Sequence, residues 1–379
     1  MMSGTSLDGI DCALVDLRVR GDALRFTLLE AKTLPFDIET AALLDGVVRR
    51  GNADLPALAR LHRALGRAYA DAAEIFLAGR TVDFAAMHGQ TIFHDGTSSS
   101  TLQAGDPFAL RERIGTSVCF DFRSADCALG GAGAPLVPYV DALLLADPVE
   151  KRVALNCGGI ANVTLLAPGL CADDDRIVAF DTGPANMLVD AWIAEATDGR
   201  AAFDCNGEGA ARGKADATIL ASMLEEPYFA MPAPKSTGRE RFGEAFLGRY
   251  RNALERLALD DALATLLALT VESIARALER YRFDDARILC SGGGARNAEL
   301  LRALQRRLLR ARVETSEAVG MPADAKEAIA FAVLGFETLR ERAANLPSVT
   351  GARKRTVLGA IAPHALPMLL AKIARESAG

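Results

Sequence analysis

The sequence has little of what disulfide-rich, zinc-binding or membrane-spanning proteins need. Its 379 residues include seven cysteines and four histidines. No two cysteines form a CxxC pair, so neither a disulfide framework nor a metal site is predicted. No apolar run approaches the roughly 18 to 20 residues that span a bilayer. We therefore expect no membrane partner.

Positive charge is not in excess either. The 43 Lys and Arg residues against 49 Asp and Glu residues give a net charge of −6. Nucleic-acid binding needs clustered Lys and Arg, so no nucleic-acid partner is expected. The first residues show no basic region followed by an apolar core, which predicts no signal peptide and a cytoplasmic protein.

Strands and helices alternate along the chain, which predicts an α/β fold with mixed sheets. A hairpin is expected over 10–17 and 24–30, and apolar spacing predicts a long helix over 55–78. Further strands are expected at 82–87, 117–122, 152–156, 160–166, 177–180 and 287–290. Further helices are expected at 184–196, 207–225, 244–256, 260–282 and 324–341.

A glycine-rich stretch at residues 130–135 is the best candidate for a boundary between lobes. At about 150 residues per domain, the length predicts two domains. We expect an N-terminal lobe of residues 1–133, completed by 341–379, and a C-terminal lobe of residues 134–340. The two lobes are expected to meet at a cleft.

Two glycine-rich segments are candidates for phosphate binding. SGTSLDG at residues 3–9 combines glycines, which admit close backbone approach, with hydroxyl donors. Asp8 and Asp11 could hold Mg²⁺ directly or through water. SGGGARN at residues 291–297 joins an expected strand to a helix, whose N-terminus favours negative charge. Each segment is also explained as an ordinary tight turn.

Two carboxylates stand out by position. Asp181 follows the expected strand 177–180 and precedes Pro184, which is placed for the first turn of a helix. It is either the N-cap of that helix or a general base at a strand end. Glu327 lies among apolar residues, where an unpaired carboxylate is costly, so it either caps a helix start or reaches a ligand.

A polar loop and a histidine segment complete the candidates. KSTGRE at residues 235–240 places cations beside hydroxyls, which suits an anionic substrate or a solvated loop. The segment HGQT at residues 88–91, with His94, has no third metal ligand nearby. Substrate contacts or structural hydrogen bonds are both open for it.

The order and spacing of these motifs resemble one family, the anhydro-N-acetylmuramic acid kinases, across nearly the whole chain. The matching segments are MSGTSLDGID (2–11), HGQTIFH (88–94), DFRSADCALGGAGAPLVP (121–138), GGIAN (158–162), FDTGPANM (180–187), KSTGRERF (235–242), GGGARN (292–297), EAIAFAVLG (327–335) and VTGARKRTVLGAI (349–361).

The resemblance implies a fold, a reaction and partners. The fold is that of the sugar-kinase, heat-shock ATPase and actin superfamily, in which two RNase-H-like lobes close over a central nucleotide and sugar cleft. The reaction is the conversion of 1,6-anhydro-N-acetylmuramic acid to N-acetylmuramic acid 6-phosphate with ATP and Mg²⁺, in peptidoglycan recycling. A homodimer is also implied. The alternatives are a kinase of the same superfamily acting on another sugar or acid, and a non-enzymatic ATP-driven switch.

The resemblance also assigns roles to residues of this sequence. Asp181 is the expected catalytic base, and Glu327 is expected to help hold the anhydro-sugar and the attacking water. Gln90 and Arg123 are the expected sugar contacts. The expected nucleotide-binding residues are Gly4, Thr5, Ser6, Leu7, Asp8, Gly9, Ile10, Asp11, Gly158, Gly159, Gly292, Gly293 and Gly294.

Two departures from the family pattern are visible. Cys157 stands where the family has isoleucine, which we expect to be a tolerated packing change. The family has an apolar strand before the SGTS turn, whereas only Met1 and Met2 precede Ser3. A missing strand would leave backbone groups unpaired. We therefore expect a start codon upstream, and higher stability and activity from a chain extended by about eight to ten residues.

Overall fold

The computed structural model describes residues 1–4, 7, 9–20, 23–49 and 53–377. The chain forms two units, Met1–Leu144 with Ala325–Gly379, and Leu145–Asp324. Residues 134–144 and 325–340 belong to the first unit, whereas the sequence predicts them in the second. The reason is that the helix over 326–339 packs against the helix over 137–145 through polar contacts. Lys326 forms an ion pair with Asp141, and the Tyr139 hydroxyl donates a hydrogen bond to the Glu337 carboxylate.

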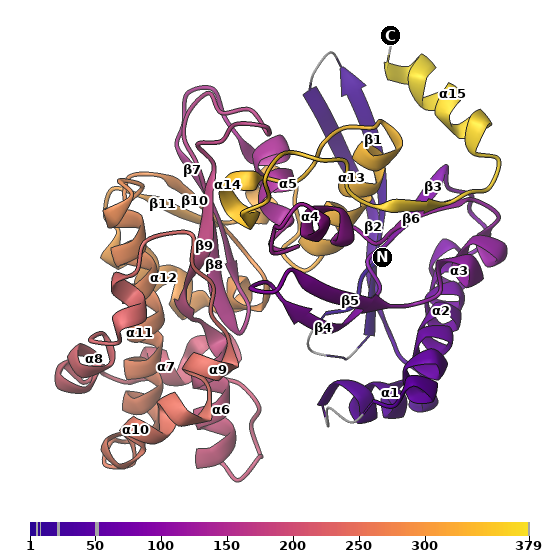
Figure 1. Ribbon diagram of the computed structural model, residues 1–379. Helices are drawn as coiled ribbons and strands as arrows, with labels where there is room; N and C mark the ends of the chain where they lie inside the picture. The colour runs from indigo at the N-terminus through magenta and orange to yellow at the C-terminus, as the bar shows by residue number, and fades with distance from the viewer. Residues whose placement is uncertain (5–6, 8, 21–22, 50–52, 378–379) are drawn as a thin grey trace. The chain divides into compact units, whose positions relative to one another are not determined.

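The first unit contains a long hairpin, a small mixed sheet and a second hairpin (Figure 1). Its strands are β1 (Gly9–Arg20), β2 (Ala23–Pro35), β3 (Phe84–Met87), β4 (Gln90–Asp95), β5 (Ser100–Ala104), β6 (Ser117–Phe120) and β12 (Ala360–Ala362). Its helices are α1 (Ile38–Leu44), α2 (Leu55–Leu77), α3 (Pro107–Ile114), α4 (Ser124–Ala128), α5 (Val137–Leu145), α13 (Lys326–Leu339), α14 (Pro347–Thr350) and α15 (Leu366–Ser377).

Strand pairing in this unit follows the alternation of apolar residues. β1 and β2 pair antiparallel, and β6 lies between the parallel β3 and the antiparallel β12. Ile10 and Cys12 of β1 point into a core that also contains Tyr69 and Phe76 of α2. This core fixes the strand that follows the SGTS segment against a long helix.

The two methionines at the start of the chain take part in the sheet. Met2 exchanges two backbone hydrogen bonds with Asp11 of β1, while the Met1 ammonium donates to the Ala86 carbonyl of β3 at 2.8 Å. Burial lowers the pKa of that ammonium. Beside this short segment lies a cavity of about 870 Å³ lined by parts of β1, β3, α2, α13 and α15. The effect of an upstream extension stays a prediction.

The second unit is built around one five-stranded mixed sheet in the order β11-β10-β7-β8-β9. β7, β8 and β9 form an antiparallel meander, and β10 and β11 run parallel to β7, as expected of an RNase-H-like lobe. The strands are β7 (Arg152–Cys157), β8 (Ile160–Leu166), β9 (Val178–Pro184), β10 (Arg287–Ser291) and β11 (Arg312–Thr315). The helices are α6 (Asn186–Ala196), α7 (Glu208–Arg212), α8 (Ala217–Met223), α9 (Arg239–Phe242), α10 (Glu244–Leu254), α11 (Leu259–Arg280) and α12 (Ala298–Arg307).

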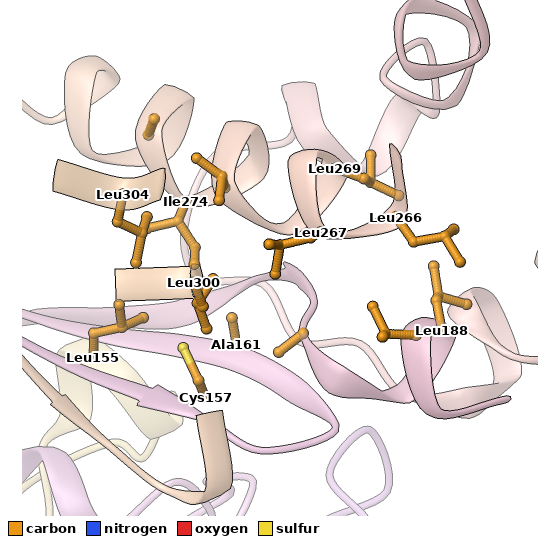
Figure 2. Packing of buried hydrophobic residues seen from close by; sticks show 14 of the residues in the cluster. Leu155, Cys157, Ala161, Leu188, Leu266, Leu267, Leu269, Ile274, Leu300 and Leu304 are labelled. Carbon is orange, nitrogen blue, oxygen red and sulfur yellow. The ribbon is translucent and has the colours of Figure 1, made fainter. Parts of the chain in front are cut away.

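The core of this unit lies between the sheet and α11. Figure 2 shows Leu267 and Ile274 of α11 above Leu155 and Cys157 of β7. Cys157 is fully buried, and burial raises the pKa of its thiol to about 12, so it is a packing residue with no reactive thiolate. Packing in this core fixes the C-terminal ends of β7 and β10. A glycine turn follows each of these two strands.

The α/β class with mixed sheets is confirmed, and one expected helix is wrong. The sequence predicts a single helix over 207–225, but α7 and α8 are separate. At Gly213 the chain is extended and packs so closely on Asp260 that a Cβ would lie 1.9 Å from its carbonyl oxygen. Within the described residues, no helix is long and apolar enough to cross a bilayer.

Candidate active site

Asp181 lies inside β9 and not at the start of a helix. It pairs with Asn162 of β8, and α6 begins only at Asn186. The Asp181 backbone N–H donates to the Lys235 carbonyl at 3.1 Å, and the Tyr228 hydroxyl donates to the Asp181 carbonyl at 2.7 Å. The N-cap alternative is therefore wrong, because the strand continues past Asp181 to Pro184. The backbone of this residue is fixed from both sides.

The Asp181 carboxylate is half-buried and accepts one hydrogen bond, from the Thr237 N–H to Oδ2 at 2.9 Å. Burial raises the pKa of this carboxyl, and the hydrogen bond from Thr237 lowers it. Burial is the larger effect, so the pKa lies at about 6. Glu240 adds to the rise, and Lys235 opposes it. A carboxylate with a pKa near 6 is a stronger base than an ordinary aspartate and is still ionised at neutral pH.

The KSTGRE loop is arranged around this carboxylate rather than solvated throughout. Lys235 is half-buried: its Nζ donates to the Tyr228 carbonyl at 3.0 Å and lies 4.3 Å from the centre of the Tyr228 ring. Burial lowers the pKa of Lys235 to about 8. The Thr237 hydroxyl is buried without a hydrogen-bond partner among the described residues. Ser236 and Arg239 are exposed.

The glycine pair 158–159 makes the turn between β7 and β8. The carbonyl of Gly158 accepts from the Asn186 N–H, and the carbonyl of Gly159 accepts from the N–H groups of Ala185 and Met187. These bonds satisfy donors at the start of α6, which have no partner inside the helix. The turn therefore connects β7 directly to the helix that follows Asp181.

The glycine turn 292–294 packs against the end of β7. Gly292 has φ +75°, and a Cβ there would lie 2.5 Å from Asn156 Oδ1. A Cβ at Gly294 would lie 2.5 Å from the Cβ of Cys157. Close packing thus explains these two glycines. Gly293 is different, because a Cβ there would meet only Asn186 Nδ2, at 4.0 Å, which leaves space for a ligand.

The SGTS segment is described only in part. Thr5, Ser6 and Asp8 lie outside the described residues, while the Leu7 N–H donates to the Gly4 carbonyl at 3.4 Å. Gly9 and Ile10 begin β1. The Asp11 carboxylate is half-buried and accepts from the Thr33 hydroxyl at 2.6 Å.

Gln90 lies beside this segment. Its Nε2 donates to the Gly4 carbonyl at 3.3 Å, and it is 2% exposed. Its Oε1 is buried and has no hydrogen-bond partner among the described residues. A buried carbonyl oxygen without a donor is costly, so it is a position where a ligand hydroxyl or amide would bind favourably.

Arg123 and Glu327 interact electrostatically in the first unit. Arg123 is half-buried, and burial lowers its pKa, with Glu327 acting in the opposite direction. Glu327 makes no hydrogen bond or ion pair with any described residue, and its side chain is exposed to solvent. It does not cap α13, since the N-cap residue is Ala325. The protein around it and the charge of Asp11 raise its pKa, whereas Lys326 and Arg123 lower it. Because the side chain is exposed, its carboxylate is accessible to a ligand.

Each unit therefore carries one candidate cluster. In the second unit, Asp181 lies with Lys235 and Thr237, and the glycine turns leave the same sheet. In the first unit, Gln90 donates a hydrogen bond to Gly4 of the SGTS segment. In the same unit, the charges of Arg123 and Glu327 attract each other. No group of three potential metal ligands occurs in the described part of the chain.

The sequence singles out the segments that hold these residues in place, but not which group in them bonds which candidate residue. Thr237 supplies the bond to Asp181, and His88 and Gly133 supply the bonds to Arg123. The KSTG, HGQT and GGAGAP segments that contain them are visible in the sequence. Their partners are 56, 35 and 10 residues away, so only the fold reveals which group meets which.

Glycine turns at strand ends suit the binding of phosphate groups, and a half-buried carboxylate of raised pKa suits proton transfer, so the arrangement fits an enzyme that acts on phosphate-containing molecules. A sequence model of one such family, anhydro-N-acetylmuramic acid kinase, matches residues 1–364. The chain belongs to this family.

Curated relatives agree over nearly the full length. The anhydro-N-acetylmuramic acid kinase of Streptomyces coelicolor is 40% identical over 382 residues, which covers 99% of this chain and 96% of the relative. The enzyme of Rhodococcus erythropolis is 40% identical, and the match covers 96% of this chain and 93% of the relative. That of Caldanaerobacter subterraneus is 37% identical, and the match covers 95% of each chain.

The solved structures to which the chain is similar are much more distant in sequence. A ROK family glucokinase from Streptomyces griseus, in complex with glucose and AMPPNP, is 10% identical with a TM-score of 0.36, covering 85% of this chain and 99% of that one. An activator of 2-hydroxyisocaproyl-CoA dehydratase from Clostridium difficile, with bound ADPNP, is 12% identical with a TM-score of 0.36, covering 87% and 97%.

Proposed function

We propose that this chain is an ATP-dependent kinase that opens the 1,6-anhydro ring of 1,6-anhydro-N-acetylmuramic acid and phosphorylates O6. The products are N-acetylmuramic acid 6-phosphate and ADP, in the recycling of peptidoglycan. The observation that carries this proposal is the family match, which extends over residues 1–364.

The chemistry requires a base for water. The anhydro bridge occupies O6, so the substrate has no free hydroxyl there to accept a phosphoryl group. Water attacks the anomeric carbon, the bond from that carbon to O6 breaks, and O6 attacks the γ-phosphate. Asp181 accepts the proton of the water, for which its position in β9 and its pKa of about 6 are suited.

The first unit supplies groups suited to the sugar. Gln90 Oε1 is a buried acceptor without a donor among the described residues, and the Arg123 guanidinium carries a positive charge close to Glu327. We assign Gln90 and Arg123 to polar groups of the sugar, and Glu327 to the sugar and the attacking water. In this role Glu327 orients the water and Asp181 removes its proton.

We assign the nucleotide to Gly4–Asp11 and to the two glycine turns of the second unit, where Gly293 leaves space for a ligand. Asp11 is the described carboxylate that we assign to Mg²⁺, directly or through water. Its charge raises the pKa of Glu327, and a cation nearby would relieve that repulsion. Mg²⁺ commonly binds through one or two carboxylates and substrate phosphates, which fits this donor set. When bound, it neutralises charge on the transferring phosphoryl group.

Two further properties belong to this proposal. ATP as donor and seven cysteines that form no disulfide among the described residues suit the reducing cytoplasm, where we place the enzyme. The homodimer that the family resemblance implies stays a prediction, which light scattering of the purified protein tests.

Turnover in ¹⁸O-labelled water tests the proposed reaction. We expect the label at the anomeric carbon of the product and not in its phosphate, because water attacks carbon while O6 takes the phosphoryl group. Mass spectrometry of the product and its fragments reads out the position. Label in released inorganic phosphate would instead indicate plain ATP hydrolysis, as in an ATP-driven switch.

The pH dependence of turnover follows from Asp181. A base acts only when ionised, so we expect kcat to rise with pH up to a plateau, with the acid limb centred near 6. An unperturbed aspartate would place that limb near 4. Steady-state rates between pH 4.5 and 8.5, in buffers of constant ionic strength, distinguish the two. An acid limb below pH 4.5 would contradict Asp181 as the base.

A further inference from the structure

His88 lies in the short connection between β3 and β4, close to the candidate sugar site. It is 5% exposed, and its ring lies 4.4 Å, centre to centre, from the ring of Phe331 on α13. Both ring nitrogens have a partner. Nδ1 lies 2.9 Å from the Gly89 carbonyl oxygen, and Nε2 lies 3.1 Å from Nε of Arg123.

These two partners fix the tautomer of the ring. The Gly89 carbonyl can only accept, so Nδ1 must carry a proton. Nε of Arg123 can only donate, so Nε2 must be the unprotonated nitrogen. The guanidinium of Arg123 and the Met1 ammonium add positive charge nearby. Together with burial, which dominates, they lower the pKa of His88 to about 3.

The second group that holds Arg123 is the Gly133 carbonyl, which accepts from Nη1 at 3.1 Å. Gly133 is itself fixed, because its N–H donates to Asp126 Oδ2 at 2.8 Å. A guanidinium has five N–H groups. The two bonds to His88 and Gly133 use one N–H on Nε and one on Nη1, and three remain for other partners.

We propose that His88 is a positioning residue, a neutral hydrogen-bond acceptor that aims the guanidinium of Arg123 at the sugar. This inference rests on the proposed function, in which Arg123 contacts the sugar. The acceptor is uncharged, and so is the Gly133 carbonyl. The two hydrogen bonds that hold the guanidinium therefore add no negative charge of their own, unlike a bond to a carboxylate, and Glu327 is the carboxylate that acts on Arg123 electrostatically.

Spectroscopy tests the tautomer without reference to activity. The chain has only four histidines, so ¹⁵N-labelled histidine gives few signals, and His88→Gln assigns the one that disappears. We expect a neutral Nδ1–H ring for His88 that does not titrate between pH 5 and 8. An Nε2–H tautomer, or titration near pH 6.5, would overturn the inference.

Kinetics test the action through Arg123. His88→Phe keeps a ring against Phe331 but removes the acceptor, and we expect kcat/KM for the anhydro-sugar to fall about 10- to 100-fold with KM for ATP unchanged. His88→Gln places an amide oxygen near the position of Nε2 and should restore most of that loss. His364→Gln, at an exposed histidine, is the matched control and should behave as wild type. Equal losses in His88→Phe and His88→Gln would contradict the acceptor role.

A double-mutant cycle completes the test. If His88 acts only through Arg123, His88→Phe has no further effect in an Arg123→Ala background. An additional loss of the same size in that background would assign His88 an independent role and overturn the inference. If the wild-type protein shows no sugar-dependent ADP release, that result contradicts the proposed function instead. The tautomer of His88 is measured by spectroscopy and does not depend on that result.

Discussion

Asp181→Asn is expected to lower turnover by about 10²- to 10⁴-fold, the range that general-base catalysis contributes. Asparagine keeps the size of the side chain and can still accept from the Thr237 N–H, but it has no basicity. Binding of the anhydro-sugar should survive, so the loss should fall on kcat. Steady-state kinetics of ADP release, with calorimetric binding of the sugar, measure both.

Stability should change in the opposite direction to activity. Asp181 has a pKa that burial raises from 3.8 to about 6 in the folded chain. Between these values the folded state binds more protons than the unfolded state, so this carboxyl makes the protein less stable as pH rises from about 4 to 6. Above pH 6 the loss is complete. At pH 7.5 the uncharged asparagine should therefore melt at the same or a higher temperature than wild type.

Asp190→Asn is the matched control. Asp190 is also half-buried in the second unit, and burial together with Asp204 raises its pKa to about 6. It has no role in the proposed reaction, so turnover should stay near wild type. A folded Asp181→Asn protein with near wild-type turnover would remove Asp181 from the role of base, and Glu327 would be the next candidate.

Asp126→Ala is expected to destabilise the first unit by about 3–5 kcal/mol. The Asp126 carboxylate is fully buried and accepts three hydrogen bonds of 2.8 Å, from Asn345 Nδ2, the Thr350 hydroxyl and the Gly133 N–H. Alanine would remove the acceptor of all three bonds. The Gly133 N–H would lose its hydrogen-bond partner, whereas Asn345 Nδ2 would keep its bond to the Lys354 carbonyl and the Thr350 hydroxyl its bond to the Leu346 carbonyl. The melting temperature should fall by about 6–20 °C. Calorimetry and urea unfolding measure the change.

Asp83→Ala provides the control for that change. Asp83 also forms a long-range contact, an ion pair with Lys372, but its side chain is 56% exposed. Exposed ion pairs contribute about 0–1 kcal/mol, so the melting temperature should hardly move. A shift for Asp126→Ala as small as that for Asp83→Ala would contradict the part assigned to the buried carboxylate.

Much of the fold could be predicted from the sequence where one periodicity dominates locally. The predicted helix over 260–282 is α11 at Leu259–Arg280, because its apolar residues repeat at helical spacing against the sheet. The hairpin of β1 and β2 is predicted by its apolar and β-branched residues and by the Gly21-Asp22 turn signal, although both strands are longer than expected. The β4–β5 hairpin was missed, since Phe93 and Leu102 are exposed and give no clear alternation.

The candidate residues could be predicted as motifs, but their alternatives could not be resolved locally. Pro184 suggests a helix start after Asp181, yet pairing with β8 extends the strand through it. Glu327 looks buried among apolar neighbours, whereas its position at the start of α13 turns it outward. The Asp126 network joins groups 219 and 224 residues apart, which no local pattern can reveal.

The most direct test of the central claim is sugar-dependent ADP release by the purified chain. Anhydro-N-acetylmuramic acid and N-acetylglucosamine are compared at equal concentrations, with ATP and Mg²⁺ present. We predict saturable ADP release with the anhydro-sugar and only background release with N-acetylglucosamine. Equal release with both sugars would indicate an ordinary sugar kinase, and release that does not depend on sugar would indicate an ATP-driven switch; either result would contradict the account.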